Sequence, residues 1–323
     1  MKRAFLYLVG LLIAAGVCAL LMVAFWPGEV ARKAGLLVSL ALLLTAYVAF
    51  IQHSIVVALR RWVRHSPLRS LALPLTLLAP YLIYAVTTET FRWDALGRLA
   101  LYAIAPSAIL LVGRREPYPP GITWPDAVAI LAVAAPVPAG WLGGIWTWPV
   151  ELGFFWALFA LPVGAYAFMV VRELEDVGFR LGWRRGDWAD GLVNFAVFGM
   201  IAIPLGMALG FIELHAGRGS ALDLITSFFV IYLTIAIPEE FLFRGVLQNL
   251  LAKTFRKGTH ALLVASVIFG LSHFHHAPMP NWKYMLMATL AGVFYGNAFR
   301  TRKRLSAAAL THALVNTVWR FWF

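Results

Sequence analysis

The sequence predicts an all-α fold, a polytopic transmembrane helical bundle of about eleven spans with a catalytic core in the last four or five. Of the 323 residues, 61% are hydrophobic and only 13% are charged, about half the roughly 25% of an average soluble domain. The mean hydropathy is +0.78. A soluble globule of this size could not cover its surface with so few polar groups. This composition excludes a secreted disulfide scaffold, a disordered regulator and an ordinary cytosolic enzyme.

Eleven apolar stretches are long enough to be candidate spans, since a span needs about 20 apolar residues. The first is too long for a signal-peptide core and no small-residue cleavage site follows it, so it is expected to remain as a mature helix. The fifth carries Pro136, Pro138 and several glycines and is the least regular. In chain order the stretches are 4–26, 35–59, 70–90, 96–113, 127–147, 150–171, 191–213, 222–251, 260–276, 284–299 and 305–320.

The basic residues predict the orientation of these spans. The net charge is +12, but the charges lie in short clusters between apolar runs, which favours lipid headgroups over nucleic acid as the partner. If Lys2 and Arg3 place the amino terminus in the cytoplasm, alternate loops hold 19 of the 27 basic residues, the opposite side holds 7, and Arg244 lies within a span. This split agrees with the positive-inside bias. We therefore expect a multi-pass protein of the cell (plasma) membrane with a cytoplasmic amino terminus.

The longest polar stretch, 172–190, divides six expected spans from five. We interpret 1–190 as an amino-terminal membrane region of unknown role and 191–323 as the functional core. The single cysteine, Cys18, lies in an apolar run, so an intrachain disulfide is impossible and redox chemistry is not expected.

Two adjacent carboxylates, Glu239 and Glu240, interrupt an apolar run within the eighth expected span. Ionisable groups inside a bilayer cost several kcal/mol unless they are paired or hydrated, so they are functional candidates by default. A structural ion pair accounts for only one of them, because Glu240 and Arg244 are four residues apart on one helix face. Pro238, just before the pair, predicts a kink or a fresh helical start.

The other polar candidates follow on later spans. His273 lies in the run from Ser272 to His276, and His312 and Asn316 are four residues apart on the last span, so both point the same way. A histidine on a helix is more often a satisfied core or interface residue than a functional one. We interpret His275 and His276, near a span end, as interfacial residues.

Taken together, Glu239, His273, His312 and Asn316 could support water attack on an amide without a serine or cysteine nucleophile. A buried carboxylate can act as the general base and one histidine can hold the water. A histidine and an amide on one helix face can stabilise an oxyanion. The same residues could instead bind zinc, although no His-Glu-x-x-His helix is present.

Three motifs make the chain resemble a known family. Glu239 to Gly245 matches the Glu-Glu-x-x-x-Arg motif of the CAAX prenyl endopeptidase and bacteriocin-processing family, also called abortive-infection-like proteins. Phe269 to His273 matches its Phe-x-x-x-His motif, and His312 to Asn316 matches its His-x-x-x-Asn/Asp/Ser motif. The resemblance covers about 222–320.

The resemblance implies an intramembrane endopeptidase of the glutamate type, and we expect it to act on a membrane-associated protein or peptide. We expect no cofactor. By position, Glu239 corresponds to the water-activating base with His273 assisting, and His312 and Asn316 correspond to the oxyanion site. Glu240 and Arg244 correspond to supporting residues. The family's eukaryotic members remove the last three residues of prenylated CAAX proteins, whereas many bacterial members have no known substrate.

Two alternatives remain open at this point. The same residues could serve a metal-dependent peptidase, or the chain could be a non-enzymatic immunity factor, transporter or scaffold.

Overall fold

The structure is a computed structural model that describes residues 29–323 except 115–116, 181 and 218. Within these residues it is helical and contains no strand, so the predicted all-α class is confirmed. The expected span at 4–26 and the sole cysteine lie outside the described residues.

Six of the described helices are long and apolar enough to cross a membrane: Val30–Ala49, Pro67–Thr88, Trp93–Val112, Phe154–Val171, Arg185–Ala208 and Ala221–Phe255. Two shorter apolar helices, Trp124–Ala134 and Gly258–Leu271, accompany them. Each overlaps a stretch expected from the sequence. The total of eleven spans stays a prediction.

Two expected spans differ from the helices in the structure. The stretch 35–59 is broken, because one helix ends at Ala49 and the next begins at His53. The stretch 127–147 is helical only to Ala134. Prolines disfavour a continuing helix, and Gly140 and Gly144 adopt positive φ angles of 67° and 66°, which glycine tolerates.

The chain divides into two compact units, and each is described by itself. The first comprises Met1–Tyr118 and Thr123–Leu174, and the second comprises Pro119–Ile122 and Glu175–Phe323. The assignment of functional regions to 1–190 and 191–323 stays a prediction.

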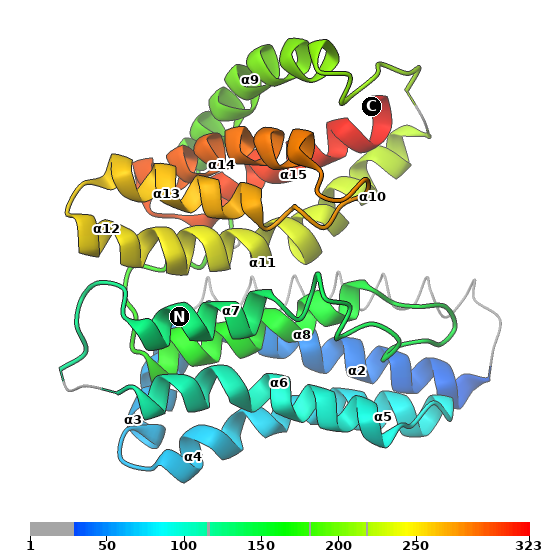
Figure 1. Cartoon of the computed structure of the whole chain (residues 1–323). Coiled ribbons are helices and arrows are strands. Elements are labelled where there is room, and N and C mark those ends of the chain that lie inside the picture. Colours follow the sequence, from blue (N-terminus) through cyan, green and yellow to red (C-terminus); the bar gives the residue numbers. More distant parts are fainter. Residues whose placement is uncertain (1–28, 115–116, 181, 218) are drawn as a thin grey trace. The chain divides into compact units, whose positions relative to one another are not determined.

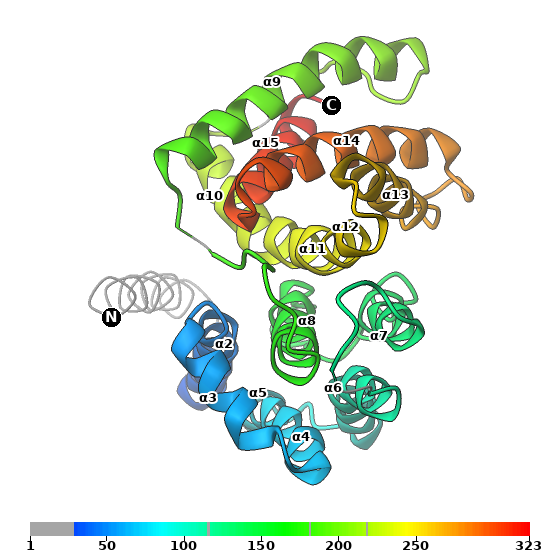
Figure 2. The same cartoon turned by 90° about the vertical axis from the view of Figure 1, so that its left-hand side faces the viewer.

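The first unit is built around one buried helix, α8. In the 18-residue window of Phe154–Val171, 83% of residues are buried, against 22–39% in the other five candidate spans. Figure 2 shows α8 among α2, α5, α6 and α7. The helices of this unit are α2 (Val30–Ala49), α3 (His53–Val63), α4 (Pro67–Ala72), η1 (Leu73–Leu77), α5 (Leu78–Thr88), α6 (Trp93–Val112), α7 (Trp124–Ala134), α8 (Phe154–Ala165) and η2 (Tyr166–Val171).

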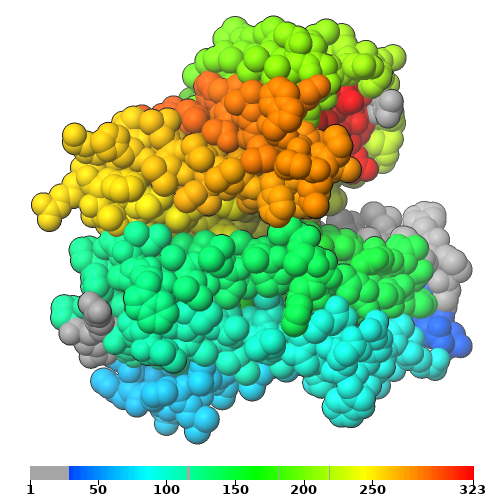
Figure 3. Space-filling view, in the orientation of Figure 1, coloured from blue at the N-terminus to red at the C-terminus, as the bar shows by residue number. Residues whose placement is uncertain are grey.

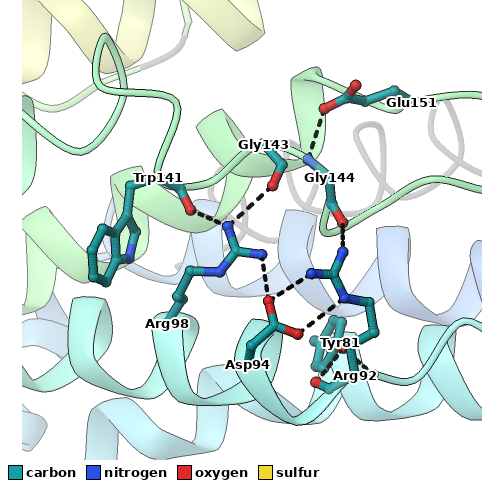
Figure 4. Close-up of polar contacts among 8 residues, drawn as sticks. All are labelled: Tyr81, Arg92, Asp94, Arg98, Trp141, Gly143, Gly144 and Glu151. Atoms are coloured by element: carbon teal, nitrogen blue, oxygen red, sulfur yellow. Dashed lines mark hydrogen bonds and ion pairs between the residues drawn. The ribbon is translucent and has the colours of Figure 1, made fainter.

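The irregular segment after α7 is held by two arginines at the start of α6 (Figure 4). Arg98 donates to the carbonyls of Trp141 at 2.7 Å and Gly143 at 3.2 Å. Arg92 donates to the carbonyl of Gly144 at 3.3 Å, and Asp94 accepts from both guanidinium groups. These contacts satisfy backbone carbonyls that a helix would otherwise have paired.

The second unit surrounds its last helix, α15, as Figures 1 and 2 show. Residues Leu305–Ala313 of α15 are all buried, and little of α15 is visible on the face shown in Figure 3. The helices of this unit are α9 (Arg185–Ala208), α10 (Ala221–Ile231), η3 (Tyr232–Ala236), α11 (Ile237–Glu240), η4 (Phe241–Gln248), α12 (Asn249–Phe255), α13 (Gly258–Leu271), α14 (Trp282–Arg302) and α15 (Leu305–Trp322).

A buried carboxylate ties the start of α15 to the start of α9. Asp187 is fully buried and accepts from the Arg184 backbone N–H at 2.8 Å, from Arg304 Nε at 2.9 Å and from Ser306 Oγ at 3.0 Å. One turn later Asp190 pairs with Arg302 at 2.6 Å, where the arginine side chain is 46% exposed. These contacts fix where α15 begins.

Candidate active site

The Glu-Glu motif lies on one short α-helical turn between two π-helices. Glu239 and Glu240 belong to α11 (Ile237–Glu240), with η3 before it and η4 after it. The sequence predicts a kink or a fresh helical start at Pro238; in the structure a short α-helix begins at Ile237 with Pro238 in its first turn, within a continuous helical path from Ala221 to Phe255. A wider turn is one way for a helix to accommodate a residue without an N–H, and π-helical turns are frequent at functional sites.

Glu240 is completely buried and makes two charged contacts. Its Oε1 lies 2.8 Å from His312 Nδ1 and its Oε2 lies 3.1 Å from Arg244 Nε. The ion pair expected from the four-residue spacing is therefore present. The contact with His312 was not anticipated, because it joins α11 to α15 across 72 positions of sequence.

Arg244 is held against α14 by close backbone approach. Its Nη2 donates to the carbonyl of Gly292 at 3.1 Å, and one helical turn on, Gln248 Nε2 donates to the carbonyl of Gly296 at 3.1 Å. A Cβ at position 296 would lie 2.4 Å from Gln248 Oε1. Gly296 therefore lets η4 reach the backbone of α14, whereas a Cβ at Gly292 would meet Ser266 and Phe269 of α13.

Three aromatic rings lie near this buried charge, and the farthest is that of Phe243 at 5.9 Å. The Arg244 guanidinium lies 4.4 Å from the ring centroid of Phe269 and 5.6 Å from that of Tyr295, within the range of cation–π attraction. Phe269 opens the Phe-x-x-x-His motif, and its ring also contacts His273 and His312, with centroids 4.8 and 6.1 Å away. The motif phenylalanine thus lies between the two histidines.

Glu239 is more open than its neighbour. Its side chain is 34% exposed, whereas that of Glu240 is fully buried. Its Oε2 lies 3.9 Å from His312 Nε2. The His312 imidazole therefore lies between the two carboxylates, with one ring nitrogen toward each.

His273 lies just past the end of α13 in a cluster of aromatic rings. Its Nδ1 is 2.8 Å from the carbonyl oxygen of Phe269, so Nδ1 carries the hydrogen and Nε2 presents a lone pair. Its ring stacks on Tyr284 at 5.2 Å. Within the described chain, no hydrogen bond joins His273 to Glu239.

The two following histidines belong to the same cluster. His276 stacks on Tyr284 with ring centroids 4.2 Å apart and an interplanar angle of 3°. His275 Nδ1 lies 3.0 Å from the carbonyl oxygen of Ser272. Both follow the end of α13 at Leu271.

Asn316 lies one turn after His312 on α15, half-buried. It makes no side-chain hydrogen bond to another described residue.

Two contributors to the site escaped the sequence reasoning. Tyr295 stacks on His312, and Tyr284 stacks on His273. The glycine pair of α14 was the available signal for a close helix contact, but nothing in the sequence paired either tyrosine with a histidine. Among the described side chains, no group of three or more His, Cys, Asp or Glu is arranged to hold a metal ion.

The fold and this centre define an all-helical membrane protein whose second unit holds two carboxylates, a histidine and a guanidinium in contact. Residues 221–318 match the family model described as Rce1-like, type II CAAX prenyl endopeptidase. The resemblance expected from the three motifs is thereby confirmed for this segment, which runs from the start of α10 to within α15. The family is one of proteases, so the segment is similar to a peptidase domain, and the apolar helices around it point to a multi-pass membrane protein. Neither the curated proteins nor the solved structures include a match to the chain.

Proposed function

We propose that the second unit is an intramembrane endopeptidase that hydrolyses a peptide bond of a membrane-associated protein or peptide with a water activated by Glu239. The observation that carries the proposal is the contrast between two adjacent glutamates. Glu240 is buried and paired with Arg244 and His312. Glu239 is partly exposed, and its carboxylate lies 3.9 Å from the same histidine. A general base must be accessible to water and substrate, and of the two glutamates Glu239 is the one whose side chain is partly exposed.

In the proposed reaction, Glu239 takes a proton from water, and the hydroxide oxygen forms a bond to the carbonyl carbon of the substrate. The carbonyl electrons move to its oxygen, giving a tetrahedral oxyanion. The C–N bond then breaks, and the proton held by Glu239 passes to the leaving amine. His273 Nε2, with Nδ1–H bound to the Phe269 carbonyl, accepts a hydrogen bond from the water and orients it.

His312 and Asn316 supply the oxyanion site in this proposal. An ionised Glu240 offers only acceptors, so His312 Nδ1 donates to it. A neutral His312 would then present a lone pair at Nε2, which repels an oxyanion. In this role His312 would donate from both ring nitrogens, with Nδ1–H toward Glu240 and with Nε2–H, beside the Asn316 amide, toward the oxyanion.

The family description and the charge pattern supply the substrate class and the location. The description of the matched family makes a prenylated CAAX peptide the first substrate to test. The distribution of basic residues supports a location in the cell membrane with the amino terminus in the cytoplasm. The region 1–190 is an added membrane part of unknown role.

The test uses the purified full chain in lipid nanodiscs and a fluorescence-quenched peptide ending in a farnesylated CAAX sequence, with the unprenylated peptide beside it. Glu239→Gln removes the base at constant shape and should lower kcat by about 100-fold or more. Glu213→Gln, an exposed glutamate in the loop after α9, is the matched control and should leave kcat unchanged. Equal rates for Glu239→Gln and the parent would refute the base role. Full activity after chelation, with metal-free protein by elemental analysis, would exclude the metal-dependent alternative.

A further inference from the structure

Tyr295 lies on α14 outside all three motifs, yet it covers one face of His312. It is 2% exposed. The two ring centroids are 4.5 Å apart, and the planes are only 12° from parallel. This is the closest ring contact that His312 makes among the described residues, because Phe269 is 6.1 Å away and nearly perpendicular at 81°.

The Glu240 contact alone does not fix the imidazole. A single hydrogen bond from Nδ1 directs that atom at Oε1, 2.8 Å away, but it tolerates rotation of the imidazole about its own Cβ–Cγ bond over a range of angles. Such rotation would move Nε2 relative to Glu239. A flat ring stacked on one face removes that freedom, while the perpendicular Phe269 limits movement from another direction.

We propose that Tyr295 is a positioning residue whose ring holds the plane of His312, so that Nε2 faces the space beside Glu239. The expected effect on kcat rests on the proposed function, whereas the effect of Tyr295 on the orientation of the His312 ring does not depend on it. The flat face of an aromatic ring supplies this support to the imidazole plane. A phenylalanine ring would supply the same face, whereas an aliphatic side chain would not.

The variants that separate this role from simple packing are Tyr295→Phe, Tyr295→Leu and Tyr295→Met. The methionine variant fills irregular space and serves if the leucine variant unfolds. Phe299→Leu is the matched control, since Phe299 is a 4% exposed aromatic residue one turn further along α14. Thermal unfolding of each variant establishes that it is folded at the assay temperature.

Two measurements test the proposal independently. With the farnesylated peptide, Tyr295→Phe should keep kcat within about threefold of the parent. Tyr295→Leu or Tyr295→Met should lower kcat at least tenfold with KM unchanged, and Phe299→Leu should do neither. With 15N-histidine labelling and assignment by His312→Gln, the ring-nitrogen shifts of His312 should match the parent in Tyr295→Phe and change in the aliphatic variants.

Each alternative result overturns the inference. An aliphatic variant with parental kcat and parental His312 shifts would show that the stack positions nothing. A loss in Tyr295→Phe as large as in Tyr295→Leu would assign the effect to the hydroxyl, and an equal loss in Phe299→Leu would assign it to packing. If the parent cleaves no peptide, the proposed function fails, and the nitrogen shifts alone still decide whether Tyr295 holds His312.

Discussion

Replacing Asp187 with asparagine should destabilise the second unit strongly, although the change alters few atoms. The carboxylate is fully buried and accepts from Arg304, Ser306 and the backbone of Arg184. The Arg304 side chain is itself only 11% exposed. Asparagine would leave that cation without its counter-charge and turn a donor amide toward one of the existing donors.

The expected magnitude follows from burial. Removing one partner of a buried ion pair costs about 3–5 kcal/mol. Arg304 keeps a second acceptor, the carbonyl of Gly182 at 2.7 Å, so the loss should lie near the lower end, about 3 kcal/mol. Asp190→Asn is the internal control, because its pair with Arg302 is partly exposed and should be worth at most about 1 kcal/mol.

Equilibrium unfolding of the two variants in mixed micelles, followed by circular dichroism, measures both changes in free energy. A double-mutant cycle with Arg304→Gln isolates the coupling between the two charges. The reasoning is refuted if Asp187→Asn is no more destabilising than Asp190→Asn, since burial would then not determine the strength of the ion pair.

Two further predictions concern the backbone and the first unit. Gly178→Ala should destabilise the second unit by about 1–2 kcal/mol or more, because a left-handed conformation disfavours a Cβ and Gly178 has φ +71°, with the new Cβ 2.5 Å from the Lys303 carbonyl oxygen. Asp126→Asn should cost about 3 kcal/mol, because Asp126 is fully buried with its Oδ1 2.7 Å from Arg172 Nε. Equilibrium unfolding in mixed micelles, as for Asp187→Asn, measures the change in stability of both variants.

Gly178→Ala and Asp126→Asn each have a matched control variant elsewhere in the chain. Gly199→Ala, within α9, would meet only ordinary contact at 3.9 Å and should stabilise by up to about 1 kcal/mol. Asp94→Asn loses pairs on a carboxylate whose side chain is 54% exposed and should change stability by less than about 1 kcal/mol. A result in which either control matches its test variant would contradict the corresponding prediction.

The hydropathy of the sequence predicted much of the fold. The free-energy cost of burying a charge pointed to the centre of the site. Long apolar stretches must be helical in a bilayer because their backbone groups have no other partners, and this physics located the candidate spans. The expense of a buried carboxylate directed attention to Glu239 and Glu240, and helical spacing gave the pair with Arg244. Each of these arguments uses only neighbours within one helix.

The rest of the site depends on how the helices pack against one another. The spacing of residues along one helix does not encode that packing. The hydrogen bond from His312 to Glu240 and the stacking of Tyr295 require the position and rotation of α14 and α15 relative to α11. The break between Ala49 and His53 occurs within an apolar run without a proline or glycine, so local propensity gave no warning. The roles assigned to Glu239, His273, His312 and Asn316 stay proposals until kinetics test them.

The π-helical turns around the glutamates have an implication for how this segment tolerates changes in length. A π-turn is equivalent to an α-helix carrying one surplus residue. Deleting a single residue from 241–248 could relax η4 to an ordinary α-helix, and because the wide turn already absorbs the surplus residue, the helix before it would keep about the same rotation relative to the helix after it. In a regular α-helix the same deletion would rotate one side by about 100° relative to the other. A one-residue deletion in η4 should therefore disturb the direction of Glu240 less than a one-residue deletion in a regular helix such as α15.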